Sequence, residues 1–172
     1  MNETLQNLVT RRSIKKYNPE IPVTDGELDA VLEAGLYAPS GMNRQGAIMV
    51  AVRDKETRDL LSKLNAAVMG SDGDPFYGAP CVIAVLVEPS GTAVEDASLV
   101  MGNLLNAAHS LGLGSCWIHR AKEVFASPEG KALLRKWGLP ESLVGVGHCI
   151  LGRAAEEREP KPRKEGRIVK VD

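Results

Sequence analysis

The run CVIAVLV at residues 81–87 constrains this chain most, because seven consecutive residues in it are apolar. A run of this length with several β-branched members predicts a strand that is buried on both faces. Residues 94–111, VEDASLVMGNLLNAAHSL, repeat apolar residues at the spacing of one helix face. Small residues such as Gly102 in this segment would permit close packing against another helix. These are the clearest strand and the clearest helix of the chain.

Several further elements are predicted from local signals. Thr24-Asp25-Gly26-Glu27 has the form of a capping box and begins a helix that extends to about Tyr37, where Pro39 stops it. The other expected elements are a short first helix ending near Arg12, a buried strand at 48–52, a helix begun by Asp54, an irregular loop at 72–80, a short strand at 115–118, a helix from Ser127 to Gly138 and a last core strand at 143–151.

The chain becomes polar and rich in proline from Gly152 onward, and its last residues differ again. IVKV at 168–171 alternates in the way expected of an edge strand. A polar arm of about 15 residues before a strand is uncommon in a compact domain. We therefore expect one domain over residues 1–172, with an arm at 152–172 that would be ordered if it wrapped around another subunit.

The charge balance excludes partners that are recognised through bulk charge. The chain of 172 residues carries 21 basic and 22 acidic side chains, which argues against nucleic acid or a membrane surface as a partner. Basic residues nevertheless cluster in RRSIKK near the start and KPRKEGR near the end, which favours a small anion over a polymer. The chain shows no signal peptide and no apolar run long enough to span a bilayer, so we expect a cytoplasmic protein whose three cysteines are reduced thiols.

Two familiar kinds of site do not match the spacing of the residues. GLGSCW at 112–117 and GVGHCI at 145–150 lack the third glycine of a dinucleotide-binding fingerprint. Cys116 with His119, and His148 with Cys149, match no common zinc motif, and both cysteines lie in apolar runs. We therefore interpret the two cysteines as small buried apolar side chains, in preference to metal ligands or a cysteine nucleophile.

Two polar clusters are better candidates for binding. RRSIKKY at 11–17 surrounds one serine with four cations, and the loop APSGMNRQ at 38–45 offers hydroxyl, amide and guanidinium groups. Arginine supplies a planar fork that suits phosphate. A solvated helix end, where cations offset the helix dipole, would explain the first cluster equally well. The presence of two cationic clusters together with the loop favours a ligand.

In their order along the chain, RRSIKKY, APSGMNRQ, LGLGSCWI and the terminal KPRK resemble the nitroreductase family of FMN-dependent oxidoreductases, from about Leu8 to Val171. The resemblance implies an α+β fold with a central β-sheet flanked by helices, in an intertwined homodimer whose C-terminal arm crosses to the partner. It also implies FMN as cofactor and NADH or NADPH as electron donor. The expected reaction is a ping-pong, two-electron reduction of a small acceptor such as a nitroaromatic or a quinone.

The resemblance also implies which residues contact the cofactor, with no side chain acting as acid or base because the cofactor carries the chemistry. The FMN phosphate and polar edge would be bound by Arg11, Arg12, Ser13 and Lys15, and the phosphate would be closed off by Lys161, Arg163 and Lys164. The partner subunit would contribute Pro39, Ser40, Gly41, Asn43 and Gln45. Asn65 would touch the flavin ring, and Cys116, Trp117 and Ile118 would lie along it, with backbone N–H groups of Trp117 and Ile118 near flavin N5.

Substrate identity is the part that the sequence leaves open. Gly46-Ala47 replaces a Pro-Trp pair found in many relatives, and His119 and Arg120 either face the substrate opening or are surface residues that begin the next helix. The loop at 69–78 is another place where specificity could reside. The same fold and flavin could instead carry out reductive dehalogenation or flavin destruction, or the chain could be a flavin-binding redox sensor without efficient turnover.

Overall fold

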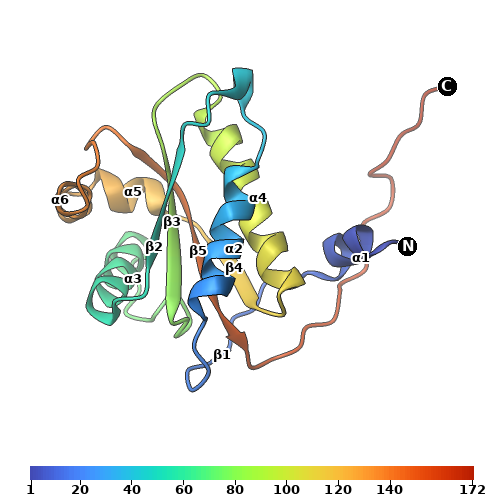
Figure 1. Cartoon of the computed structure of the whole chain (residues 1–172), viewed down its shortest axis with the longest axis horizontal. Coiled ribbons are helices and arrows are strands. Elements are labelled where there is room, and N and C mark those ends of the chain that lie inside the picture. Colours follow the sequence, from blue (N-terminus) through green and yellow to red (C-terminus); the bar gives the residue numbers. More distant parts are fainter.

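The apolar run at 81–87 forms the central strand β3 (Cys81–Val87) of a five-stranded antiparallel sheet in the computed structural model, which describes residues 1–172 (Figure 1). All seven residues of β3 are buried, as the sequence predicts. The strand pairs with β2 (Ala47–Val52) on one side and with β5 (Val144–Ala154) on the other. The far edge of β5 pairs with both β1 (Tyr17–Asn18) and β4 (Gly114–Ile118).

Helices cover both faces of this sheet, so alternate residues of β3 enter two different cores. Val82, Ala84 and Leu86 belong to a cluster of 18 buried residues. That cluster is completed by α3 (Lys55–Met69), α5 (Ala121–Ala126) and α6 (Pro128–Lys136). Ile83 and Val85 belong to a second cluster of 17, which is completed by α2 (Asp25–Leu36) and α4 (Ala93–Ser110). The molecule thus has a helix–sheet–helix arrangement (Figure 1).

Local signals in the sequence place the helix boundaries well. Thr24 and Glu27 form the expected reciprocal capping box at the start of α2. The Asp54 carboxylate accepts a hydrogen bond from the backbone N–H of Thr57 at the start of α3. Ser127 caps α6, whose first residue is proline. Chain reversal after α4 uses Gly112 at φ 73°, where glycine is favoured.

Two expectations about strands are wrong. Residues 48–52 were expected to be buried, yet in β2 only Val52 is buried, because this strand pairs with β3 alone and forms the sheet edge. Residues 168–171 form no strand, because no strand of the chain lies beside them to pair with. Residues 157–172 are exposed throughout and extend away from the sheet (Figure 1). The sequence analysis also missed the short strand β1.

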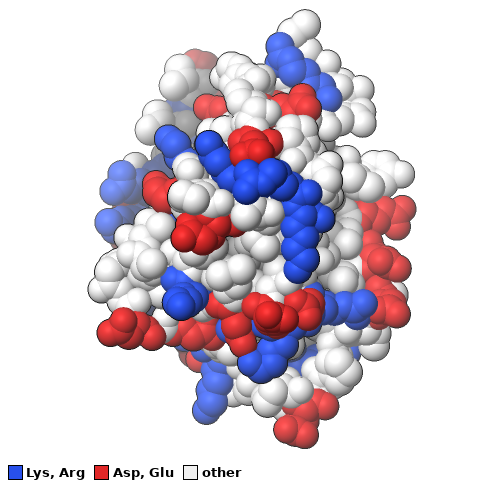
Figure 2. Space-filling view, turned by 90° about the vertical axis from the view of Figure 1, so that its left-hand side faces the viewer, with Lys and Arg blue, Asp and Glu red and all other residues white.

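The outer surfaces differ in character. The side formed by α3, α5 and α6 shows acidic and basic side chains close together rather than a wide area of one sign (Figure 2). Helix α1 (Glu3–Thr10) has no buried residue and leaves Leu5, Leu8 and Val9 about half exposed. None of the helices combines the length and apolarity needed to cross a bilayer.

Candidate functional site

The basic segment near the N-terminus lies against β4, although the two are about a hundred residues apart in sequence. The backbone N–H of Ile14 donates to the carbonyl of Ser115 at 3.0 Å, and Ser13 forms a parallel bridge with Ser115. On its other side the backbone N–H of Lys15 donates to the Glu156 carboxylate at 2.6 Å. These contacts fix Ser13 and Lys15 beside the strand expected to lie along the cofactor ring.

Several polar atoms at this junction are buried without a hydrogen-bond partner. They are Nη1 of Arg11, Nε of Arg12 and Oγ of Ser115. The remaining donors of Arg12 are partly used within the chain, since its Nη1 donates to the carbonyls of Val9 and Arg11 at 2.9 and 2.6 Å. Unpaired buried N–H groups are costly, and an anionic oxygen is a strong acceptor for guanidinium. The junction therefore fits a phosphate-bearing ligand.

A cavity of about 420 Å³ lies between Lys15, the end of β4 and the loop that follows α3. Its lining brings together three sequence-predicted residues of β4, Cys116, Trp117 and Ile118, with Lys15. His119 and Arg120 also line it, at the point where they precede α5. The loop at 69–78 contributes Tyr77 among other residues. The cavity is thus walled by segments from three distant parts of the chain.

Asn65 lies beneath this cavity and supports the turn after β4. Its side chain is fully buried; the amide Nδ2 donates to the carbonyl of His119 at 2.7 Å, and Oδ1 accepts from Nε of Arg120 at 3.0 Å. Arg120 has φ 73°, a left-handed conformation that is unfavourable for a side chain of its size. Asn65 therefore holds His119 and Arg120 at the cavity mouth, and its contact with the flavin ring stays a prediction.

The loop at 38–45 is held tightly but lies elsewhere. The buried Asp96 carboxylate accepts from the backbone N–H of Gly41 at 2.8 Å and from the Thr92 hydroxyl at 2.9 Å. A Cβ atom at Gly41 would lie 2.6 Å from Oγ1 of Thr92, so glycine is needed there. Pro39, Ser40 and Gln45 line a separate cavity of about 180 Å³. Within one chain, the two polar clusters do not meet.

The remaining predicted contacts lie in the exposed C-terminal arm. Lys161, Arg163 and Lys164 are exposed and form no ion pair with the rest of the chain. The structure therefore does not bring them to Arg11 and Arg12. Their role in closing a phosphate site stays a prediction that depends on where the arm lies in an assembly.

Two histidines, which lie in different surroundings, have pKa values below the usual range for histidine. Burial lowers the pKa of His109, and the nearby charges of Arg11 and Arg12 lower it further; its Nε2 lies 2.9 Å from the Thr10 hydroxyl. Burial lowers the pKa of His148 to about 3, with a further contribution from the charge of Arg120. Both ring nitrogens of His148 lack a partner, and its ring packs against Phe76 and Phe125.

The cysteines are all free and buried. Burial raises the pKa of Cys81 to about 11 and raises that of Cys149 strongly as well. No group of three or more His, Cys, Asp or Glu side chains is arranged to hold a metal ion. Sequence reasoning missed Glu156, Asp96 and Tyr77, which hold or line the candidate sites, and only the turn-forming residues around Tyr77 gave a local signal.

The fold and site define an α+β protein in which a segment with unpaired guanidinium groups lies against a strand whose end walls a cavity. The chain matches the family model described as the nitroreductase family over residues 8–75 and 70–153. It is 32% identical to a putative NADH dehydrogenase/NAD(P)H nitroreductase of Archaeoglobus fulgidus, covering 92% of this chain and 90% of the relative. It is 28% identical to an FMN reductase [NAD(P)H] of Bacillus subtilis, covering 95% of this chain and 70% of that protein.

Solved structures of nitroreductases are similar to this chain in fold and in sequence. A nitroreductase with bound FMN from Bacteroides fragilis superimposes with a TM-score of 0.91 at 31% identity over 100% of both chains. A nitroreductase with bound FMN from Desulfitobacterium hafniense gives a TM-score of 0.89 at 30% identity over 100% of both chains. The chain belongs to the nitroreductase family, and the family and α+β fold expected from its motifs are confirmed.

Proposed function

We propose that this chain is an FMN-dependent oxidoreductase that uses NADH or NADPH to reduce nitroaromatics, quinones or similar acceptors in a ping-pong, two-electron reaction. The observation that carries the proposal is the junction of Arg11–Lys15 with β4. It joins a segment whose Arg11 and Arg12 carry buried, unpaired guanidinium N–H groups to the strand that, together with Lys15, lines a cavity of about 420 Å³. Relatives named as NAD(P)H-dependent FMN reductases and nitroreductases, and similar structures described with bound FMN, support it.

The residues of the junction suit the two ends of FMN, a cofactor that supplies hydride transfer when bound. Arg11, Arg12 and Ser13 would hold the phosphate through charge-assisted hydrogen bonds. Lys15 lies in the cavity wall, where its cation would offset negative charge at the polar edge of the ring. Beyond Ser115 the outer edge of β4 pairs with no other strand, which leaves backbone groups at Trp117 and Ile118 available to the ring.

We further propose that the functional unit is a homodimer, because part of the site lies too far away within one chain. The loop with Ser40 lines its own cavity, and the arm with Arg163 is exposed. Leu36, Tyr37 and Met42, next to this loop, are 67%, 79% and 87% exposed. Large exposed apolar side chains in one area are typical of an interface. A partner subunit placed over this area would bury them and bring its loop and arm to the cofactor.

Sedimentation tests the dimer. We expect a dimer at micromolar concentration, with an interface in the ~2,000–5,000 Å² class. Deleting residues 157–172 should weaken both association and FMN binding if the arm crosses to the partner. A monomer that still holds FMN at the same concentration would show that one chain completes the site, contrary to this proposal.

The enzymatic function is tested on the purified protein. We expect yellow protein with about one FMN per chain, reduced rapidly by NADH or NADPH in a stopped-flow experiment and reoxidised by a quinone or nitroaromatic acceptor. Colourless protein that FMN cannot reconstitute would disprove the proposal. Protein that binds FMN but is reduced slowly by both nucleotides would instead favour a flavin-binding sensor. The cytoplasmic location expected from the sequence stays a prediction.

A further inference from the structure

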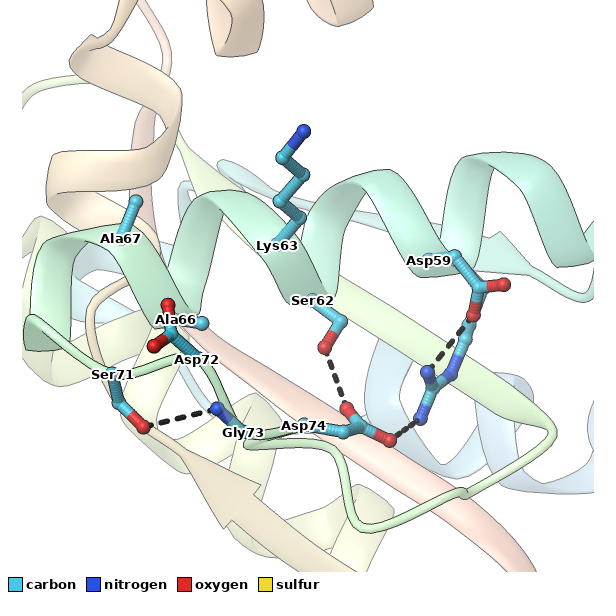
Figure 3. Close-up of a pocket in the computed structure, with 10 residues that line it drawn as sticks. Asp59, Ser62, Lys63, Ala66, Ala67, Ser71, Asp72, Gly73 and Asp74 are labelled. Atoms are coloured by element: carbon cyan, nitrogen blue, oxygen red, sulfur yellow. Dashed lines mark hydrogen bonds and ion pairs between the residues drawn. The ribbon is translucent and has the colours of Figure 1, made fainter.

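A tight turn at Asp74–Gly78 forms one wall of the candidate cofactor cavity, and its geometry is set by a single carboxylate. Asp74 accepts hydrogen bonds from Nη2 of Arg58 at 2.6 Å and from the Ser62 hydroxyl at 2.5 Å (Figure 3). It also accepts from the backbone N–H groups of Phe76 at 2.8 Å and Gly78 at 2.7 Å. The turn is therefore tied at both ends to a carboxylate anchored on α3.

The arginine that holds Asp74 is itself buried and constrained. Nε of Arg58 donates to the carbonyl of Ala79 at 3.0 Å, and its guanidinium lies 5.5 Å from the centre of the Phe76 ring. Burial raises the pKa of Asp74, but the hydrogen bonds from Ser62, Arg58 and the two backbone N–H groups outweigh it, so the net pKa lies below the usual value. Asp74 therefore remains an anion at neutral pH and keeps these bonds.

The consequence of this arrangement is the position of Tyr77. Its backbone has φ 52°, a conformation that side chains of its size rarely adopt and that the bonds to Asp74 maintain. The turn directs the ring to the cavity opposite Cys116–Arg120, and 40% of the residue is exposed. Nζ of Lys15 lies 5.0 Å from the centre of this ring, within the range of a cation–π interaction.

Lys15 has no competing partner of opposite charge. Its ammonium group takes part in no ion pair. The nearby Glu156 carboxylate accepts from the backbone N–H of Lys15 and is paired with Arg158. The Asp74 carboxylate is already paired with the Arg58 guanidinium. The Tyr77 ring is thus the group that fixes the otherwise flexible lysine side chain inside the cavity.

We propose that Tyr77 is a positioning residue that holds the Lys15 cation at the polar edge of the bound flavin and thereby raises its reduction potential. This inference rests on the proposed function. A reduced flavin carries negative charge at that edge, and a fixed cation stabilises it more than a mobile, hydrated one does. Tyr77 acts through Lys15 and does not itself need to touch the cofactor.

The test is the reduction potential of bound FMN in a cycle of variants. Tyr77→Phe keeps the ring face and should leave the ratio of reduced to oxidised FMN within about twofold. Tyr77→Gly removes the ring, while glycine accepts the positive φ without strain, so folding is preserved. We expect Tyr77→Gly to lower that ratio about tenfold, which is about 30 mV for a two-electron couple. In a Lys15→Met background, Tyr77→Gly should cause no further shift.

The outcomes separate this inference from the proposed function. An unchanged potential in Tyr77→Gly that holds FMN would overturn the role of Tyr77. A shift of equal size in the Lys15→Met background would also overturn it, because the ring would then act on the flavin directly. Wild-type protein that binds no FMN would overturn the proposed function and this inference with it. Chemical denaturation of each variant shows whether the Tyr77→Gly fold is intact.

Discussion

The turn at Asp74–Gly78 and the arm at 157–172 are both irregular, proline-containing segments, but only the turn is held in place by contacts within the chain. The turn is held by four hydrogen bonds to one carboxylate, one of which comes from a buried arginine. Every residue of the arm is exposed. The wall of the candidate cofactor cavity is therefore completed within one chain. The cations expected at the phosphate require another surface to hold them.

The difference follows from what each segment can bury. The turn places Phe76 fully inside the core, which offsets the entropy lost on ordering its backbone. The arm carries Ile168, Val169 and Val171 at 82%, 83% and 91% exposure, so in one chain it gains no such compensation. Exposed apolar residues gathered at the end of a polar arm are suited to burial against a partner.

Removing the buried arginine is expected to have the largest effect. Arg58→Ala leaves Asp74 without its cation and the carbonyl of Ala79 without its donor, and we expect a loss of about 3 kcal/mol in unfolding free energy. Urea denaturation measures it. The surface pair of Lys55 with Asp59 on the same helix provides the control, because Lys55→Ala removes an exposed cation and should leave stability unchanged. An equally small effect of Arg58→Ala would mean that the turn does not depend on this ion pair.

The two cationic clusters can be compared directly through FMN binding. Arg12→Ala and Arg163→Ala should each weaken FMN binding by about 1.5–3 kcal/mol, the range for a hydrogen bond to a charged group. Riboflavin, which lacks the phosphate, should bind more weakly to wild type and be nearly indifferent to both changes. Fluorescence titration with the two flavins measures this. Equal losses for FMN and riboflavin would show that these arginines do not touch the phosphate.

Burial of His148 in the core should make the stability of the folded chain depend on pH. Its pKa is lowered to about 3 in the folded chain, whereas the imidazole of an unfolded chain titrates near 6.5. Because the unfolded state binds the proton more readily, stability present above pH 6.5 is lost as the pH falls towards 3. The loss reaches about 1.4 kcal/mol per pH unit. Unfolding free energies measured at several pH values should show this slope.

The variant His148→Leu isolates this contribution between about pH 6.5 and 4.5, above the range in which most carboxyl groups take up protons. His109, whose pKa is also lowered, is retained in both proteins, so its contribution is the same in each. We expect a shallower pH dependence in the variant. Identical slopes in the two proteins would show that the buried imidazole is not the source of acid sensitivity.

Local patterns in the sequence predict much of the fold but not the environment of each element. The seven apolar residues of β3 and the capping box of α2 lie within single elements, so they can be recognised directly. Whether β2 is central or at an edge depends on which strands pair with it, and that information lies elsewhere in the chain. The alternation at 168–171 likewise gives no strand without a neighbouring edge.

The same distinction applies to the site. The motifs around Arg11 and Trp117 resemble a family and therefore indicate a shared cofactor site, and the structure brings Lys15 and β4 to one cavity. Tyr77 could not be predicted as a neighbour of Lys15, because its place depends on the hydrogen bonds of Asp74 to Arg58 and Ser62 on another element. Asn65 was expected at the flavin, but its deep burial beneath His119 depends on a contact across 54 positions.

The smallest expected effects come from the cysteines, one in the cavity wall and two in the core. Cys116 lines the cavity, while Cys81 and Cys149 are buried on the opposite face of the sheet with pKa values raised by burial, so their thiols remain protonated. Because thiolate is the reactive form, neither core cysteine is suited to nucleophilic attack. Single replacement by Ala should leave turnover per bound FMN within severalfold at all three positions. Steady-state assays normalised to flavin content test this. A loss beyond ~10³-fold in Cys116→Ala with FMN retained would instead indicate covalent catalysis at the cavity wall.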